Sequence, residues 1–511
     1  MKQYEMFELT YTAAMPHGNQ VTIDLEAVFT HEGESVSVKG FYAGNNTYKI
    51  RFLPMCAGEY SYAVSGVVSD AGTLYAGNAD RHGPVHADGC HFLHADGTRC
   101  SPFGTTVYAL AHQEPQVTED TFESLKNAPF NKVRLCLFPK HYNYNHNDPE
   151  LYPFEKDKEG NWNVNHPCFQ FWDSFEQKLQ RLDTLGIQAD FILFHSYDRW
   201  GFSHLGMEKN LIYLDYLTRR FSAFPHIWWS LANEYDLMFD LTEHDWEKIE
   251  SFAAMNDPYH HLLSNHNCFA FWDAARPNIT HASIQTRQLT RIAEWREKYN
   301  KPVVVDECCY EGNLPEFWGS ISGPEMVRRF WRIVVTGGYC THGDTFLDPE
   351  QDIVWWAKGG HLKGESAPRI AFLREIVESL PGPIDPQSFF TAELFKKAMS
   401  PNLDLALEGT HPNYASFVRS FARMGPQEAA SFLATEFSFM GRCGDDAFLI
   451  FYDGRCCAKD TLDLPEDKTY RVELIDVWNM TRKVIAKHSS GKTVINLPGC
   501  ENMAVLALRD K

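Results

Sequence analysis

Between residues 100 and 380, short apolar runs alternate with longer amphipathic runs, and no other feature of the sequence constrains the fold as much. The apolar runs have the length of buried β-strands, and the amphipathic runs have the 3.6-residue period of helices. Strands that alternate with helices build a parallel sheet, because each helix returns the chain to the start of the next strand. Eight such units in roughly 280 residues predict a (β/α)8 barrel.

The eight predicted strands are Phe103–Leu110, Lys132–Phe138, Ile187–His195, Ile227–Asn233, His261–Asn265, Ile279–Ile284, Pro302–Glu307 and Gly338–Thr345. The predicted helices are Glu119–Asn127, Phe169–Gly186, Asn210–Phe224, Glu243–Asn256, Leu289–Asn300, Gly323–Gly337 and Ser366–Leu380. No helix is predicted at 268–278, between the fifth and sixth strands. Helix N-caps are expected at Thr242 and Ser322, and helix C-caps at Gly186 and Gly337.

The segments before and after this region have the alternating apolar and polar pattern of β-strands. In the first ninety residues, alternating runs such as Val21–Phe29 are separated by turn signals such as Ala43-Gly-Asn-Asn46. Short alternating runs return near the C-terminus, for example Tyr470–Val477. We therefore predict an N-terminal β-sandwich (1–90), the barrel (91–382) and a C-terminal β-sandwich domain (383–511).

Composition excludes several classes of partner. The net charge of −20 argues against nucleic acid and against anionic membranes. No apolar run approaches the ~20 residues that span a bilayer. The N-terminus has no apolar core of signal-peptide length, and the 13 cysteines are scattered rather than spaced as a disulfide framework. A cytoplasmic protein is expected, and its oligomeric state, including a homo-oligomer, is left open.

Two carboxylates mark the carboxyl ends of predicted strands. Asn233-Glu234 follows the fourth strand, and Glu307 ends the seventh. An isolated Asn-Glu would more often be a surface loop, but the carboxyl ends of barrel strands meet at one face, where active sites are built. Glycoside hydrolysis needs such a pair, one acid to protonate the leaving oxygen and one to attack or stabilise the anomeric carbon. The separation that distinguishes retention from inversion cannot be read from sequence.

Longer motifs carry a family resemblance. They include His195-Ser-Tyr-Asp-Arg-Trp-Gly-Phe-Ser203, Trp228-Trp-Ser-Leu-Ala-Asn-Glu-Tyr-Asp236, Arg51-Phe-Leu-Pro54 and Gly104-Thr-Thr106. The chain resembles the clan A (β/α)8 glycoside hydrolases and, more narrowly, a bacterial group of apiosidase-like glycosidases with three modules. The resemblance implies that Glu234 is the acid/base and Glu307 the nucleophile. Arg134 matches an arginine common on the second strand.

Further residues are candidates for substrate binding. A guanidinium at Arg134 would keep a neighbouring nucleophile ionised, and Asn233 suits a hydrogen bond to a sugar 2-hydroxyl. His195 ends the third strand and has counterparts in cellulase-like relatives, although a core histidine would look the same. The remaining candidates rest on position or on aromatic character, and plain core packing is their alternative; they are His266, Gln285, Trp200, Tyr310 and Trp355. The aromatic loop at 139–167 is a further candidate wall of the site.

No metal site and no cofactor are expected, because His-x-His, paired Cys-x2-Cys and Gly-rich phosphate motifs are missing from the sequence. The hypothesis is a retaining, exo-acting glycosidase that cleaves a small β-glycoside or oligosaccharide. The alternative is a non-catalytic carbohydrate-binding or scaffold protein with a degenerate glycosidase barrel. A metal-dependent amidohydrolase on the same fold is a third, disfavoured by the missing metal ligands.

Overall fold

The structure is a computed structural model, and it describes every residue except 349–352, 388–396, 426–427, 429–438 and 511. The chain forms two compact units, which are described separately below. The first comprises 1–285, 298–321 and 340–364; the second comprises 286–297, 322–339 and 365–511.

Eight parallel strands form the central sheet of the first unit. The strands lie next to one another in the order of a barrel, which confirms the predicted (β/α)8 architecture. In sheet order, the strands are β17 (Leu263–Ser264), β16 (Ile227–Asn233), β15 (Gln188–His195), β12 (Lys132–Cys136), β11 (Phe103–Thr106), β21 (Tyr339–His342), β19 (Val303–Glu307) and β18 (Ala282–Gln285).

The sheet ends at β17 and β18, and only a few hydrogen bonds join these two strands. The Thr280 amide donates to the Leu263 carbonyl at 2.9 Å. The Gln285 amide donates to Asn267 Oδ1 at 3.0 Å. The connection at 268–278 contains no helix, as predicted.

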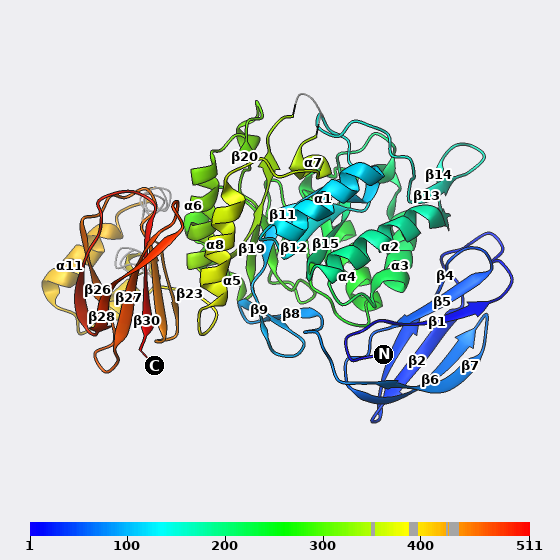
Figure 1. Cartoon of the computed structure of the whole chain (residues 1–511), viewed down its shortest axis with the longest axis horizontal. Helices are drawn as coiled ribbons and strands as arrows, with labels where there is room; N and C mark the ends of the chain where they lie inside the picture. The colour runs from blue at the N-terminus through cyan, green and yellow to red at the C-terminus, as the bar shows by residue number, and fades with distance from the viewer. Residues whose placement is uncertain (349–352, 388–396, 426–427, 429–438, 511) are drawn as a thin grey trace. The chain divides into compact units, whose positions relative to one another are not determined.

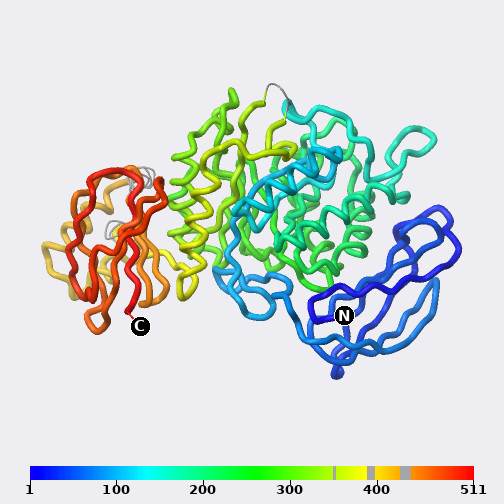
Figure 2. The backbone as a smooth tube through the Cα atoms, viewed as in Figure 1, coloured from blue at the N-terminus to red at the C-terminus, as the bar shows by residue number. Residues whose placement is uncertain are grey.

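Helices surround this sheet in the first unit, alternating with the strands along the chain (Figures 1 and 2). They are α1 (Pro115–Asn127), α2 (Phe169–Thr184), α3 (Met207–Phe221), α4 (Glu243–Asn256) and the short α7 (Trp355–Lys358). The predicted caps are present: Thr242 and Asp245 form a reciprocal capping box, and Ser322 Oγ accepts from the Glu325 amide. Gly186 takes φ of +68°, as a residue beyond a helix end requires.

Antiparallel strands form the N-terminal part of the first unit. One sheet has the order β3 (Glu34–Lys39), β2 (Leu25–His31), β6 (Gly58–Gly66) and β7 (Asp70–Ala76); the other has β1 (Phe7–Thr12), β5 (Thr47–Phe52) and β4 (Phe41–Tyr42). Apolar residues alternate along β2 with exposed ones, so one face packs inward, as in a sandwich. A small sheet of β8 (Val85–Asp88), β9 (His91–His94) and β10 (Arg99–Cys100) precedes the barrel.

A buried ion-pair network ties this β-sandwich to the barrel helices. Arg51 on β5 donates to both carboxylate oxygens of Glu176 on α2, at 2.6 and 2.9 Å. Arg220 on α3 donates to the same carboxylate at 2.6 Å. Two guanidiniums therefore share one buried carboxylate, and each charge depends on the others for compensation.

The second unit contains the C-terminal β domain and the barrel helices α5 (Ile292–Tyr299, in large part), α6 (Gly323–Val335) and α8 (Ser366–Glu378). Six antiparallel strands lie in the order β23 (Asp385–Pro386), β24 (Phe439–Cys443), β25 (Ala447–Phe451), β30 (Met503–Arg509), β27 (Tyr470–Asp476) and β28 (Thr481–Ser489). β26 (Lys459–Asp463) and β29 (Lys492–Asn496) form a second, two-stranded sheet. The prediction of a C-terminal β-sandwich is confirmed.

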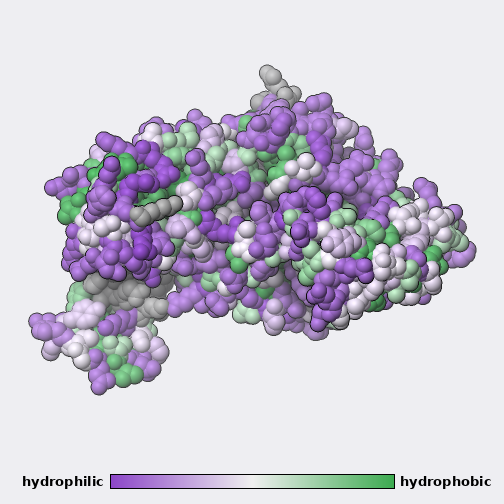
Figure 3. Space-filling view, turned by 60° about the horizontal axis from the view of Figure 1, so that its bottom comes forward, coloured by the Kyte–Doolittle hydropathy of each residue, from purple (hydrophilic) through white to green (hydrophobic). Residues whose placement is uncertain are grey.

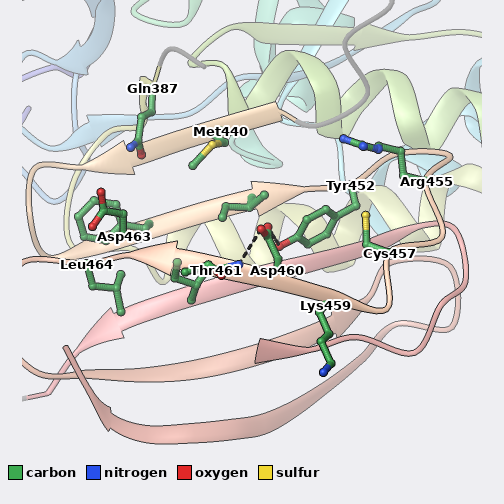
Figure 4. Close-up of a pocket in the computed structure, with 13 residues that line it drawn as sticks. Gln387, Met440, Tyr452, Arg455, Cys457, Lys459, Asp460, Thr461, Asp463 and Leu464 are labelled. Carbon is green, nitrogen blue, oxygen red and sulfur yellow. Dashed lines mark hydrogen bonds between the residues drawn. The ribbon is translucent and has the colours of Figure 1, made fainter. Parts of the chain in front are cut away.

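A cavity of about 380 Å³ opens in this β domain, and Figure 4 shows its lining. Phe448, Ile450 and Leu462 line it and belong to the core cluster of the domain. Polar side chains share the lining, and among them the Tyr452 hydroxyl donates to Asp460 at 2.6 Å.

The visible face of the molecule is mostly hydrophilic, with apolar side chains in small separate patches (Figure 3). Within the described ranges, no helix is both long and apolar enough to cross a bilayer.

Candidate active site

Glu234 follows the last residue of β16 and begins the turn that leaves the barrel. Its backbone adopts a left-handed conformation, with φ of +57° and ψ of +58°. A non-glycine residue held in this region is strained, and such strain clusters at functional sites. The residue is 6% exposed. The turn thus holds a buried carboxylate at the carboxyl end of the sheet, where a barrel places its active site.

Glu307 ends β19 and is 4% exposed. Two residues later, Cys309 also has a positive φ, of +71°. Both glutamates therefore lie where an apolar strand ends and the backbone turns sharply.

A chain of polar contacts joins the two carboxylates. The Tyr108 hydroxyl contacts Glu307 Oε1 and lies 2.9 Å from Asn233 Oδ1. Asn233 Nδ2 donates to Glu234 Oε2 at 3.1 Å. Only two side chains thus separate the carboxylates along this path, and the predicted Asn233 lies in the middle of it.

Three further groups hold Glu234. The Tyr197 hydroxyl donates to Glu234 Oε2, and Gln285 Nε2 donates to Oε1 at 3.1 Å. The backbone amide of Glu234 donates to His266 Nδ1 at 3.4 Å. The predicted residues Gln285 and His266 are therefore in contact with Glu234, one through its side chain and one through its backbone.

Arg134 is the cation beside Glu307, as the sequence suggested. Its NH1 atom lies 3.9 Å from Glu307 Oε1, and its Nε lies 3.5 Å from Asp190 and 3.7 Å from Asp306. Burial alone would lower the pKa of Arg134, but these carboxylates outweigh it and raise the pKa. The guanidinium therefore stays charged next to Glu307.

The pKa of Glu307 is raised, chiefly because burial disfavours its charged form and secondarily because Glu234 is negative. Arg134 and Lys140 oppose this shift. Glu307 therefore ionises less readily than an exposed glutamate.

His195 is buried at the end of β15, and its Nε2 lies 3.2 Å from the Phe138 carbonyl. Burial, assisted by the charge of Lys140, lowers its pKa to about 4. Burial also lowers the pKa of His266 well below its ordinary value. Both imidazoles are thus neutral near pH 7 and can take part only as neutral hydrogen-bonding groups.

One aromatic candidate, Trp355, lies in the core. It is 0% exposed, its indole N–H donates to Thr105 Oγ1 at 3.0 Å, and a sugar contact for it stays a prediction. The neighbouring Trp356 instead packs 5.5 Å from the rings of both Tyr108 and Tyr310. The difference arises because consecutive residues of a helical turn point about 100° apart.

The other two aromatic candidates differ in their surroundings. Tyr310 is buried, and its pKa is raised by burial and then by the charge of Glu307, so its hydroxyl remains protonated near that carboxylate. Trp200 is partly exposed and packs in a loop cluster, 6.4 Å from the ring of Tyr152. Its indole N–H donates to Asp148 at 2.7 Å. A sugar contact for Trp200 stays a prediction.

Sequence reasoning missed Tyr108, Tyr197 and Lys140. Tyr108 lies two residues beyond β11, and Tyr197 lies two residues beyond β15. Lys140 lies four residues beyond β12. A usable signal was present: residues just past the carboxyl ends of barrel strands converge on the active-site face. Of the residues that the structure describes, no three His, Cys, Asp or Glu side chains form a group able to hold a metal ion.

The catalytic-domain model of the apiosidase-like family matches residues 86–381, more than half of the chain. The chain belongs to this family. Residues 1–66 and 437–507 match two further family models, each described as a domain of unknown function. No curated protein matches the chain.

Solved structures agree with membership of the apiosidase-like family. A Bacteroides vulgatus protein described as a candidate glycoside hydrolase is 33% identical, with a TM-score of 0.85 over 100% of this chain and 99% of that one. A family 5 glycoside hydrolase from the same organism is 15% identical, with a TM-score of 0.58 over 84% of this chain and 93% of that one. The second likeness concerns the fold alone, and it shows that this apiosidase-like chain has the fold of glycoside hydrolases.

Proposed function

We propose that this protein is a retaining glycoside hydrolase with Glu234 as acid/base and Glu307 as nucleophile. The observation that carries the proposal is the buried pair of carboxylates at the ends of β16 and β19, linked through Asn233 and Tyr108. Family membership and the glycoside hydrolase fold support the same reaction class.

In the first step, Glu307 attacks the anomeric carbon while the glycosidic bond breaks and Glu234 gives its proton to the leaving oxygen. In the second step, Glu234 takes a proton from water, and the resulting nucleophile displaces Glu307 from the anomeric carbon. Arg134 supports the ionised form of Glu307. Asn233 contacts Glu234, and we propose that its amide binds a sugar hydroxyl next to the reacting carbon.

Retention is the outcome that we propose from the contacts shared by the two carboxylates. Retaining enzymes hold their carboxyl groups ~5–5.5 Å apart, whereas inverting enzymes leave room for a water between them. Glu234 and Glu307 share contacts through Tyr108 and Asn233, which supports the closer arrangement.

Exo-action on a small β-glycoside or oligosaccharide is supported by the burial of the site. An open groove would expose the carboxylates, yet Glu234 and Glu307 are 6% and 4% exposed. Tyr142 in the loop after β12 packs 5.1 Å from the ring of Trp356, which helps to wall the site. A cytosolic setting fits the thiols, because none of the thirteen cysteines, all at described positions, forms a disulfide.

The test is release of nitrophenol from a panel of aryl α- and β-glycosides, with Glu307→Gln as the control. We expect wild-type activity on a β-glycoside and none from the variant. NMR of the first product formed gives its anomeric configuration, and an inverted product would overturn the retaining mechanism. Binding of sugars without hydrolysis of any of these glycosides would favour the non-catalytic alternative. Rapid viscosity loss from a polymeric substrate would overturn exo-action.

A further inference from the structure

Lys140 is a buried cation to which the two-carboxylate mechanism gives no role. It lies in the loop after β12 and is 2% exposed. Its backbone carbonyl accepts a hydrogen bond from Asn145 Nδ2 at 2.7 Å, which fixes the loop around it. The ammonium nitrogen lies 3.4 Å from the centre of the Tyr108 ring and 4.3 Å from that of Tyr197. The rings of Tyr142 and Trp356 lie farther out, at 5.4 and 5.9 Å.

These rings hold the ammonium but leave its hydrogen-bonding capacity unused. In the described part of the chain, Lys140 Nζ makes no hydrogen bond and no ion pair within 4 Å. Aromatic faces attract a cation, but they supply no lone pairs for its three N–H groups. An ammonium that keeps free N–H groups beside two carboxylates can donate them to an oxygen of a ligand that enters the site.

The location of Lys140 points to the substrate as that ligand. The two nearest rings belong to the tyrosines that hold the carboxylates, since Tyr108 contacts Glu307 and Tyr197 contacts Glu234. The charges of Glu234 and Glu307 both act on the ammonium and oppose the lowering of its pKa by burial. A sugar bound between the two glutamates would therefore lie next to Lys140.

The charges of the site indicate what kind of sugar it takes. Four buried carboxylates (Asp190, Asp306, Glu234 and Glu307) face three buried cations (Lys132, Arg134 and Lys140). When one glutamate is protonated, as the acid step requires, three negative charges face three positive ones. A uronate would add an uncompensated negative charge in a region of low dielectric, whereas an uncharged sugar would not.

We propose that the Lys140 ammonium donates hydrogen bonds to hydroxyl oxygens of an uncharged sugar bound between Glu234 and Glu307. This role makes Lys140 a specificity-determining substrate contact, and it rests on the glycosidase function proposed above.

The test compares wild type with Lys140→Met, which keeps the length of the side chain and removes the donors. Lys178→Met is the matched control, because Lys178 is also a buried lysine but donates to the Ala111 carbonyl. Each protein is assayed on the best neutral nitrophenyl glycoside and on its monodeoxy analogues. We expect Lys140→Met to lower kcat/KM about 100-fold on the parent substrate and Lys178→Met to leave it within about twofold.

The analogues separate contact from indirect effects. On the analogue that lacks the hydroxyl bound by Lys140, wild type and Lys140→Met should have the same kcat/KM. If Lys140→Met lowered kcat/KM by the same factor on every analogue, or did not lower it at all, the proposal would be overturned. Wild type should also cleave nitrophenyl uronides at least about 100-fold less efficiently than the neutral hexosides; equal rates would overturn the choice of an uncharged sugar.

A readout without turnover distinguishes this proposal from the glycosidase function itself. Calorimetric titration with neutral monosaccharides should give binding to wild type and at least about tenfold weaker binding to Lys140→Met. This binding result does not depend on hydrolysis. Failure to hydrolyse any glycoside would refute only the proposed catalytic role. Equal affinities, or absence of binding to wild type, would overturn the role of Lys140.

Discussion

The Tyr108 hydroxyl contacts Glu307 Oε1 and also lies 2.9 Å from Asn233 Oδ1. A hydroxyl carries one proton, so it can donate to only one of these oxygens at a time. The Asn233 amide nitrogen donates to Glu234, so its oxygen is left to accept from the Tyr108 hydroxyl. Tyr108 then has no proton to give to a second hydrogen bond, and this arrangement suits a protonated Glu307 that donates to the Tyr108 oxygen.

The reverse direction of these hydrogen bonds suits catalysis. If Glu307 is ionised, it accepts a hydrogen bond from the Tyr108 hydroxyl. The Asn233 amide is then satisfied when its nitrogen donates to the Tyr108 oxygen and its oxygen accepts from a protonated Glu234. Amide orientation is assigned from the hydrogen-bond network, so both arrangements are compatible with the same heavy-atom positions. Tyr108 and Asn233 would therefore couple ionisation of the proposed nucleophile, Glu307, to protonation of the proposed acid, Glu234.

Tyr108→Phe should reveal this coupling. The Tyr108 hydrogen bond lowers the pKa of Glu307, so its removal should raise that pKa. Because the proposed nucleophile Glu307 must be ionised to attack, the acidic limb of the kcat/KM profile should move to higher pH. Tyr213→Phe, which removes a buried hydroxyl near the Leu193 carbonyl, is the control and should leave the limb in place. An unmoved limb in Tyr108→Phe would contradict the coupling.

Glu307→Gln should lower kcat by at least about a thousandfold, because the amide cannot form the covalent intermediate. The swap is nearly isosteric, so the melting temperature should stay close to that of wild type. Steady-state kinetics on an activated aryl glycoside and a thermal melt check both parts. Retention of more than about a tenth of wild-type kcat would rule out Glu307 as nucleophile.

Glu234→Ala should slow substrates with poor leaving groups by about 10²–10⁴-fold, because they need the proton. With activated nitrophenyl glycosides, the variant should form the glycosyl-enzyme with little loss of rate and should then accumulate it. Added azide should restore turnover by attacking that intermediate without base catalysis, and the glycosyl azide product can be identified by mass spectrometry. Equal loss on all leaving groups, with no effect of azide, would move the role to another carboxylate.

Stability should fall in mild acid because six buried or half-buried histidines are held neutral. Burial lowers the pKa of each below its ordinary value, to about 4 for His226, whereas an unfolded histidine titrates near 6.5; the six are His112, His195, His226, His266, His281 and His342. Between these values the unfolded chain binds more protons, so the free energy of unfolding drops as pH falls.

Each neutral imidazole should contribute up to about 1.4 kcal/mol per pH unit to this slope. Denaturant titrations between pH 7 and 4.5 measure it. His226→Gln should make the slope shallower, and replacement of the exposed His244 by Gln should not. A stability that does not change over this range would contradict the assignment of buried neutral histidines.

Glu176→Gln should destabilise the first unit by about 3–5 kcal/mol, because it leaves Arg51 and Arg220 buried without their shared charge. Asp173→Asn is the matched control: Asp173 pairs with Arg220 at 2.5 Å but is largely exposed, so its loss should cost about 1 kcal/mol or less. Denaturant titration measures both variants. Equal losses of stability in Glu176→Gln and Asp173→Asn would contradict the role of burial.

Local patterns in the sequence were enough to predict the barrel strands, the helix caps and the two glutamates at the strand ends. Thr242 and Gly186 illustrate this, because caps depend on residues within one helical turn. The eight-strand order follows from the same information, since short βα connections allow few topologies.

Only the tertiary structure decided which side chains meet the carboxylates. Tyr108 and Glu307 are separated by 199 positions in the chain, and nothing in either local sequence specifies their contact. Lys140 is an ordinary loop lysine until the rings of Tyr108 and Tyr197 enclose it. Trp355 and Trp356 are adjacent and identical in type, yet one is core and the other packs beside the site. Sequence patterns report periodicity and strand ends, whereas burial, charge pairing and ring contacts arise only when distant strands are brought together.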